Sequence, residues 1–244
     1  NLKYLMEYKK QLNFEFISAL NELLKSYAKE YSDNIEKIID IFNKDIPFSK
    51  KFTLDVLRNE SKIILDFANN NNLSNDFITF FSILSVFPYR EAVANFVKSK
   101  INLREHISGF CPVCGHWPGI SYLTDKEGKK IMACICCGTV WSFKRMKCSF
   151  CLSSDKDVLG YLNIEGEEKI SAYTCNTCRR YLKTIRISDD ADIFETKWHI
   201  IDYLSSGDLD IAALQNKYLQ EPILATRFQG PLDEHLDLYI KKST

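Results

Sequence analysis

Nine cysteines lie between Cys111 and Cys178, and eight of them form four Cys-x-x-Cys pairs. The pairs are Cys111/Cys114, Cys134/Cys137, Cys148/Cys151 and Cys175/Cys178. One Cys-x-x-Cys turn presents two sulfurs from a single tight loop, and two such turns supply the four-sulfur tetrahedron that holds zinc or iron. The spacing therefore predicts two tetrathiolate sites, each binding one iron or zinc ion through four of these eight cysteines.

The lengths of the two spacers favour a sequential pairing of the turns. Nineteen residues separate Cys114 from Cys134 and 23 separate Cys151 from Cys175, which is enough for a hairpin in each case. Turn-forming residues at 126–128 and 165–166 lie within these spacers and would close the hairpins. The first pair should then join the second, and the third should join the fourth. A cross-braced arrangement, first with third and second with fourth, stays open as the alternative.

Two other residues near the pairs are candidate ligands of lower rank. Cys136 lies inside the second pair and is expected to pack beside the metal rather than bind it, while His116 is a substitute ligand two residues after Cys114. Four cysteines leave no open coordination position for water, which argues against hydrolytic zinc catalysis. Apolar cover is expected from five aromatic residues: Phe110, Trp117, Tyr122, Trp141 and Phe143.

The residue after each pair distinguishes the two predicted sites. Gly115 and Gly138 follow the first two pairs, whereas Leu152 and Arg179 follow the third and fourth. Glycine takes a left-handed backbone conformation without steric cost, and this conformation turns backbone amides towards the sulfurs. We therefore expect the two sites to differ in metal affinity or redox behaviour.

The rest of the chain carries helical patterns. Apolar residues recur three and four positions apart over residues 12–31 and 54–68, and a shorter segment covers residues 35–42. Ser74 is a candidate N-cap for the next helix, which should end or kink near Pro88. Helical spacing returns after Asp189, at residues 194–204 and 211–218, and a last helix is expected from residue 231.

These patterns together predict an α+β fold in four parts. The parts are a helical domain at 1–108, a first four-cysteine ribbon at 109–143, a second at 144–187, and a C-terminal helical segment at 188–244. The two ribbons are expected to be tandem rubredoxin-like or zinc-ribbon β modules.

The charge of the chain as a whole does not favour nucleic-acid binding. Lys plus Arg and Asp plus Glu total 32 each, so no net charge draws the whole chain to nucleic acid. Residues 110–186 carry twelve basic against seven acidic side chains, an excess that largely compensates two four-thiolate metal sites. The alternative is a zinc-ribbon regulator that binds nucleic acid through five cations: Lys144, Arg145, Lys147, Arg179 and Arg180. A redox enzyme using a free cysteine pair or Cys136 is a third hypothesis.

The same properties predict a location. The longest apolar run, residues 77–87, is far shorter than the ~20 residues of a membrane span and should form a buried helix. The first residues show no secretory signal pattern. Close cysteine pairs at ligand spacing suit reduced thiols. We therefore expect a cytoplasmic protein without a membrane span, and a homodimer stays open as its assembly.

The cysteine pairs and their flanking residues resemble the formate dehydrogenase accessory protein family, FdhE. The resemblance rests on Cys-Pro-Val-Cys-Gly at 111–115, on Cys-x-x-Cys-Gly-x-x-Trp-x-x-x-Arg-x-x-Cys-x-x-Cys at 134–151, and on Cys-x-x-Cys-x-x-Tyr-Leu-Lys at 175–183. It implies a cytoplasmic accessory protein without enzymatic activity, which contacts the catalytic subunit of formate dehydrogenase and supports its assembly or activation. It also implies rubredoxin-like knuckles associated with iron, with the eight paired cysteines as ligands.

Overall fold

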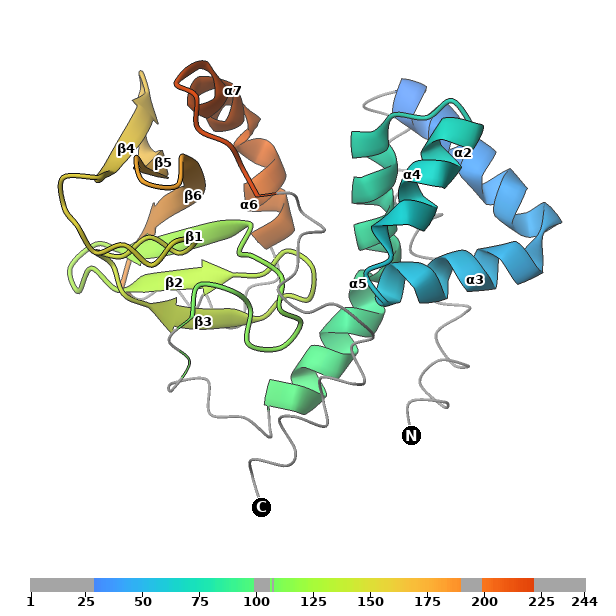
Figure 1. Cartoon of the computed structure of the whole chain (residues 1–244), viewed down its shortest axis with the longest axis horizontal. Helices are drawn as coiled ribbons and strands as arrows, with labels where there is room; N and C mark the ends of the chain where they lie inside the picture. The colour runs from blue at the N-terminus through green and yellow to red at the C-terminus, as the bar shows by residue number, and fades with distance from the viewer. Residues whose placement is uncertain (1–28, 99–105, 107, 190–198, 222–244) are drawn as a thin grey trace. The chain divides into compact units, whose positions relative to one another are not determined.

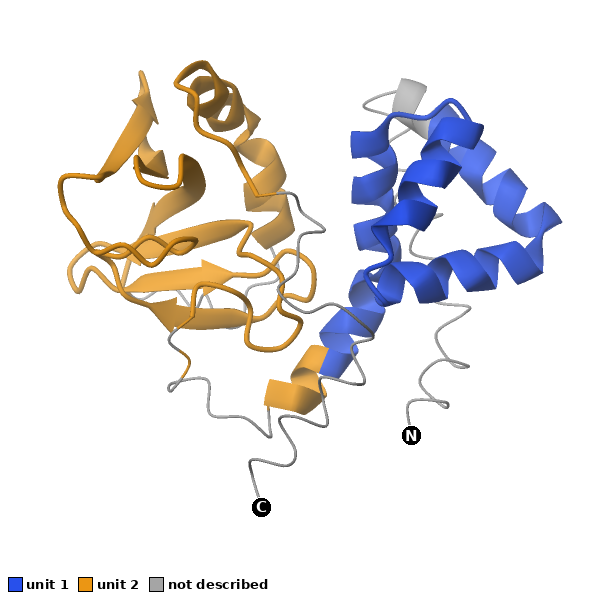
Figure 2. Cartoon of the chain, viewed as in Figure 1, with its two compact units in different colours: residues 1–93, 230–235 blue, residues 94–229, 236–244 orange. Residues whose placement is uncertain are grey.

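The computed structural model of this 244-residue chain describes residues 29–98, 106, 108–189 and 199–221. The chain divides into two compact units, one made of residues 1–93 with 230–235 and the other of residues 94–229 with 236–244 (Figure 2). Most of the helix predicted at residues 12–31, and all of the one from residue 231, lie outside the described residues.

The first unit is helical. Helices α2 (Lys29–Lys44), α3 (Ile46–Leu57) and α4 (Ser61–Asn70) precede the long helix α5 (Asn75–Lys98), as Figure 1 shows. Four phenylalanine rings pack with centroids 5.2–6.1 Å apart and form an aromatic core: Phe42, Phe48, Phe52 and Phe67. The Asp45 carboxylate accepts a hydrogen bond from the Phe48 amide and so caps the N-terminus of α3.

The single helix predicted over residues 54–68 is wrong, because the chain turns between α3 and α4. Asn59 adopts a left-handed conformation with φ 63°, which ends the helical pattern. The buried Arg90 side chain holds this turn by donating 2.8 Å hydrogen bonds to the Val56 carbonyl and the Asn59 side chain. A contact between residues more than 30 positions apart thus overrides the local helical spacing.

Helix α5 begins after Ser74, whose hydroxyl accepts a long hydrogen bond from the Phe77 amide, as the predicted cap requires. The helix does not end at Pro88 but continues to Lys98. By length and composition alone, α5 is the one helix of the described residues that could cross a membrane. Core helices of globular proteins meet the same criterion, and the buried Ile78 and Ile83 together with the hydrogen-bonded Arg90 place α5 in the helical core.

The second unit is built on one six-stranded sheet with the order β3-β2-β1-β6-β5-β4. The strands are β1 (Ile120–Thr124), β2 (Lys130–Ala133), β3 (Val140–Phe143), β4 (Leu159–Ile164), β5 (Glu167–Cys175) and β6 (Arg180–Ile187). All neighbouring strands are antiparallel except β1 and β6, which run parallel. Both predicted hairpins are confirmed, since β1 and β2 flank residues 126–128 and β4 and β5 flank residues 165–166.

Each cysteine ribbon supplies three strands, and the ribbons join through β1 and β6. Ser121 and Thr184 lie opposite each other in this parallel pair, and their buried hydroxyls are 2.8 Å apart. The predicted α+β architecture with a helical region, two four-cysteine clusters and C-terminal helices is confirmed. The ribbons nevertheless share a single sheet, which the separate hairpin patterns did not indicate.

Two short helices cover one face of the sheet. Helix α6 (His199–Ser205) contacts β1, and helix α7 (Gly207–Gln215) contacts β4 and β5 (Figure 1). Tyr203 and Leu209 are buried towards the sheet, whereas Ile201 and Leu204, part of the predicted apolar stripe, are about half exposed. Both helices that lie wholly within the second unit, α6 and α7, thus pack on the same face of the sheet.

A buried Tyr122, His199 and Asp202 group fixes α6 to β1. The Tyr122 hydroxyl donates to the Asp202 carboxylate over 2.6 Å and lies 2.9 Å from His199 Nδ1, which therefore donates to it. The second ring nitrogen of His199 is buried and faces no hydrogen-bond acceptor of the described residues. Burial lowers the pKa of His199, more than the nearby Asp202 raises it.

This arrangement predicts a pH-dependent stability. The unfolded chain binds a proton on His199 near pH 6.5 while the folded protein resists it, so the free energy of unfolding should fall as the pH drops below about 6.5. His199→Asn keeps a donor for Tyr122 but cannot titrate, and should show a smaller loss between pH 7 and 5.5. Urea unfolding of both proteins at the two pH values tests this, and equal losses would refute the assignment to His199.

Candidate metal centres

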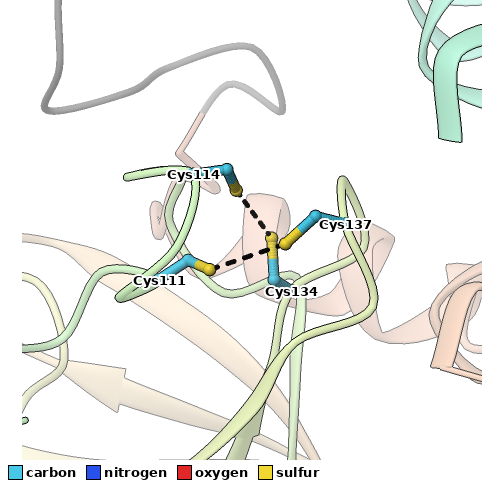
Figure 3. A group of neighbouring side chains, drawn as sticks. All are labelled: Cys111, Cys114, Cys134 and Cys137. Carbon is cyan, nitrogen blue, oxygen red and sulfur yellow. Dashed lines mark hydrogen bonds between the residues drawn. The ribbon is translucent and has the colours of Figure 1, made fainter. Parts of the chain in front are cut away.

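The first cluster gathers four sulfurs at one end of β1, β2 and β3. Cys111 and Cys114 lie just before β1, and Cys134 and Cys137 lie in the turn between β2 and β3. The sulfur atoms of Cys111 and Cys137 are 3.6 Å apart, and those of Cys114 and Cys134 are 3.5 Å apart (Figure 3). All four sulfurs lie within 4.8 Å of one another, and all four side chains are buried.

The second cluster repeats this plan with the later strands. Cys148 and Cys151 precede β4, Cys175 is the last residue of β5, and Cys178 lies in the turn between β5 and β6. The closest sulfur pairs are Cys148 with Cys178 at 3.7 Å and Cys151 with Cys175 at 3.6 Å. This cluster is more open, because Cys151 is exposed and Cys178 is partly exposed. The structure therefore groups the pairs sequentially and not in the cross-braced alternative.

The geometry of both clusters fits a four-coordinate metal ion. A metal with sulfur ligands at about 2.3 Å in a tetrahedron separates the sulfurs by about 3.8 Å. The closest sulfur pairs, at 3.5–3.7 Å, are near this value, while a disulfide would require about 2.05 Å. Each cluster could hold one ion, and four sulfur donors suit zinc and iron equally.

The pKa values of the cluster cysteines indicate that four thiolates at one site would need a bound cation. Burial raises the pKa of the Cys114 and Cys134 thiols well above the ordinary range, and raises that of Cys148 to about 11. Burial acts in the same direction on Cys137, but contacts with three neighbouring sulfurs and the Thr139 hydroxyl lower its pKa. Four adjacent thiolates are therefore unstable without a positive charge among them.

Polar groups around the first cluster aim at its sulfurs. The Thr139 hydroxyl lies 3.2 Å from the Cys137 sulfur, and the Val113 amide donates to the Cys111 sulfur at 3.5 Å. His116 is fully buried, and its Nδ1 lies 3.2 Å from the Cys114 carbonyl oxygen and 3.3 Å from the Cys114 sulfur. Because both neighbours are acceptors, His116 Nδ1 donates to them and supports the sulfur without replacing it. The cysteine spacing gave no indication of the roles of Thr139 and Val113.

The four turns share one backbone conformation despite their different sequences. Gly115, Gly138, Leu152 and Arg179 all have positive φ, between 55° and 71°. In each turn the amide of this residue donates to the carbonyl of the first cysteine over 2.8–3.1 Å. Glycine and non-glycine turns therefore do not differ in shape, but they differ in strain, since a left-handed residue with a side chain costs roughly 1–2 kcal/mol.

This strain predicts a stabilising substitution. Leu152 is only 40% exposed, so the loss of its partly buried side chain offsets some of the strain that Leu152→Gly relieves. We expect the free energy of unfolding of the metal-loaded protein to rise by about 0.5–1 kcal/mol in urea. Ser154→Gly, at an exposed neighbouring position outside the left-handed region, is the matched control and should lower it slightly. Equal effects of the two changes would contradict the strain argument.

The two clusters are joined through the segments beside them. A side chain at Gly109 would lie 1.6 Å from the Ser149 carbonyl oxygen, so the chain before the first turn passes directly against the third. The Trp117 ring lies between Phe110 and Phe150, with centroid distances of 6.3 and 5.5 Å. Tyr122 was expected to cover a metal site, but its side chain instead points to α6.

The remaining predicted site residues lie outside the two four-sulfur groups. Cys136 is fully buried and lies outside the four-sulfur group of Cys134 and Cys137.

Two of the five cations of the nucleic-acid alternative are engaged within the chain. Arg179 bonds the carbonyls of Asn216 and Lys217, and Arg180 pairs with Glu221 at 2.8 Å. They tie the second cluster to the end of α7 and are not presented for phosphate binding.

Comparison with curated proteins gives relatives of one kind. A protein of Aquifex aeolicus described as "Protein FdhE homolog" is 31% identical over 137 residues, covering 54% of this chain and 48% of the relative. A "Protein FdhE homolog" of Haemophilus influenzae is 26% identical over 194 residues, covering 78% of this chain and 62% of the relative. This chain thus spans about half to three fifths of the length of these two relatives.

A solved structure agrees with these relatives, although no protein-family profile matches the chain. The crystal structure of the FdhE protein from Pseudomonas aeruginosa superposes with a TM-score of 0.51 at 25% identity. The match covers 69% of this chain and 60% of that protein.

Proposed function

We propose, from the FdhE family to which this chain belongs, that it is an accessory protein in the maturation of formate dehydrogenase. In this role it binds the catalytic subunit of that enzyme in the cytoplasm and supports its assembly or activation. The chain turns over no substrate of its own. The observation that carries the proposal is the pair of closed four-cysteine clusters on one sheet.

The eight paired cysteines are the proposed metal ligands. Four sulfurs around each ion leave no position for a substrate or water, so neither ion would act as a Lewis acid in hydrolysis. The ions would fix the turns that precede β1 and β4 and thereby shape the surface of the ribbons. Iron in the more exposed second cluster would also permit a change of oxidation state, whereas zinc would be structural at both.

Deletion and capture experiments test the proposal in the source organism. Deletion of the gene should abolish formate dehydrogenase activity while transcript levels are unchanged, and the intact gene should restore it. A tagged copy should co-purify with the catalytic subunit. Complementation by Cys134→Ser should fail, and Cys136→Ser, which leaves both clusters intact, should restore activity. Full activity in the deletion strain together with no captured subunit would overturn the proposal.

A further inference from the structure

A cavity of about 390 Å³ lies on the sheet face opposite α6 and α7, beside the second cysteine cluster. Its walls come from Lys130 of β2, from the segment after β3 and from one face of β4, β5 and β6. Five basic side chains line it, and no Asp or Glu does: Lys130, Arg145, Lys147, Arg180 and Arg186. Pockets of this volume commonly enclose small organic ligands.

Strand register places the lining residues of the strands on a single face of the sheet. Lys130 lies opposite Leu123, and Leu123 lies opposite Arg186 in the neighbouring strand. Tyr173 lies opposite both Tyr161 and Leu182, so a second row of side chains borders the cavity. Directly opposed residues point to the same side of a sheet, which explains why residues from four strands converge here.

Lys130 is the most informative residue of the cavity. Its side chain is only 5% exposed, and its ammonium lies 5.6 Å from the centre of the Tyr173 ring and 6.0 Å from that of Phe143. No carboxylate of the described residues lies within ion-pair distance of it. Buried lysines are ordinarily paired with a carboxylate. Here only two aromatic rings and the charge of the Cys148 sulfur offset the ammonium, which leaves it able to bind an anion that enters the cavity.

The neighbouring metal site does not account for all of this charge. Four thiolates and a divalent ion carry two negative charges, and Glu221 already pairs with Arg180 at 2.8 Å. The five lining cations therefore leave an excess of about two positive charges, which matches a phosphate monoester better than a single carboxylate. Because the cavity is larger than a phosphate, the rest of the ligand must occupy the aromatic wall of Tyr161 and Tyr173, whose rings lie 6.1 Å apart.

We infer that this cavity, which we call the β-face pocket, binds a phosphorylated small molecule of nucleotide size. The phosphate lies among Lys130, Arg145 and Arg186, and a flat ring of the ligand stacks on the exposed Tyr161. The inference concerns this pocket alone and does not depend on the accessory function. An acidic peptide is the competing occupant, but the depth at which Lys130 lies favours a compact ligand.

Calorimetric titration of the metal-loaded full chain tests the inference. The probes are AMP and GMP, with adenosine, inorganic phosphate and an acidic hexapeptide as comparisons. A nucleoside monophosphate should bind at least tenfold more tightly than the other three. No nucleotide binding up to millimolar concentration, or tighter binding of the peptide, would overturn the inference.

Variants locate the binding in the β-face pocket. Arg186→Gln and Tyr161→Ala alter exposed side chains, and each should weaken nucleotide binding roughly tenfold, as should Lys130→Met. Lys129→Gln is the matched control, because Lys129 is exposed, pairs with Glu127 and does not line the cavity. Metal content verifies that each variant is folded. Equal weakening by Lys129→Gln would mean unspecific charge attraction and would refute the site.

Discussion

Replacement of Cys134 by serine is expected to reduce the metal content of the purified protein from about two ions per chain to about one. The Cys134 sulfur lies 3.5 Å from that of Cys114 in the first cluster, and its side chain has no exposed surface. A serine oxygen cannot replace a thiolate in a four-sulfur site. The second cluster shares no ligand with the first and should keep its ion.

The same substitution should unfold the first ribbon. Metal binding by small four-ligand sites contributes on the order of 10 kcal/mol to folding. The turns around this cluster border the buried core of Ile120, Tyr122 and Val140, which the ribbon cannot maintain once the turns separate. Elemental analysis and an absorption spectrum of protein purified without oxygen measure the ion, and circular dichroism measures the loss of β structure.

Cys136→Ser provides the matched control for this experiment. Cys136 is also fully buried and lies two residues from Cys134, but its sulfur is not in the four-sulfur group. This variant should retain two ions and lose only the packing of one thiol and its hydrogen bond with Cys134. If Cys136→Ser also removed one ion, or if Cys134→Ser retained two, the assignment of ligands would be wrong. Charge-transfer bands would identify iron, while a colourless protein with the same metal content would identify zinc.

Asp210→Ala is expected to lower the free energy of unfolding by about 3 kcal/mol, because it leaves Lys183 as a buried and uncompensated cation. The Lys183 ammonium is fully buried and donates to the Asp210 carboxylate over 2.9 Å and to the Tyr203 carbonyl over 2.6 Å. The Tyr181 hydroxyl donates to the other Asp210 oxygen over 2.7 Å. Since Asp210 is 30% exposed, solvent moderates the loss, and the expected value lies at the low end for buried pairs.

Two variants separate this mechanism from a general effect on α7. Asp208→Ala changes an exposed carboxylate in the same helical turn and should cost less than about 0.5 kcal/mol. Lys183→Met in the Asp210→Ala background removes the stranded charge and should recover part of the loss. Urea unfolding of the metal-loaded proteins gives all three values. Equal losses for Asp208→Ala and Asp210→Ala would contradict the role of the ion pair.

Local patterns predicted the elements that depend on neighbouring residues. The turn at 126–128 closes the β1–β2 hairpin, and that at 165–166 closes the β4–β5 hairpin, because short-range backbone geometry decides such turns. The cap at Ser74 was predictable for the same reason. The prediction of one helix over residues 54–68 is wrong, because Arg90 of α5 stabilises the turn at Asn59.

The site was predictable only in part. Four cysteine turns at ligand spacing identify two clusters without knowledge of the rest of the fold, because each turn carries its own two sulfurs. The hydrogen bonds from Thr139 and His116 to these sulfurs, and the unequal exposure of the clusters, depend on how the turns pack. All four turns share one left-handed conformation, and the expected difference between the sites in metal affinity or redox behaviour stays a prediction.

The sequence by itself determined that this chain forms two ribbons with two four-sulfur clusters, since ligand spacing and hairpin turns are encoded within about 30 residues. Only the tertiary structure decided that the ribbons form one sheet. The parallel pairing of β1 with β6 joins residues about 60 positions apart, such as Ser121 and Thr184, and no local pattern specifies such a partner. That pairing also creates the β-face pocket, because long-range register sets which side chains share a face. The packing of α7 on the opposite face places Asp210 against Lys183.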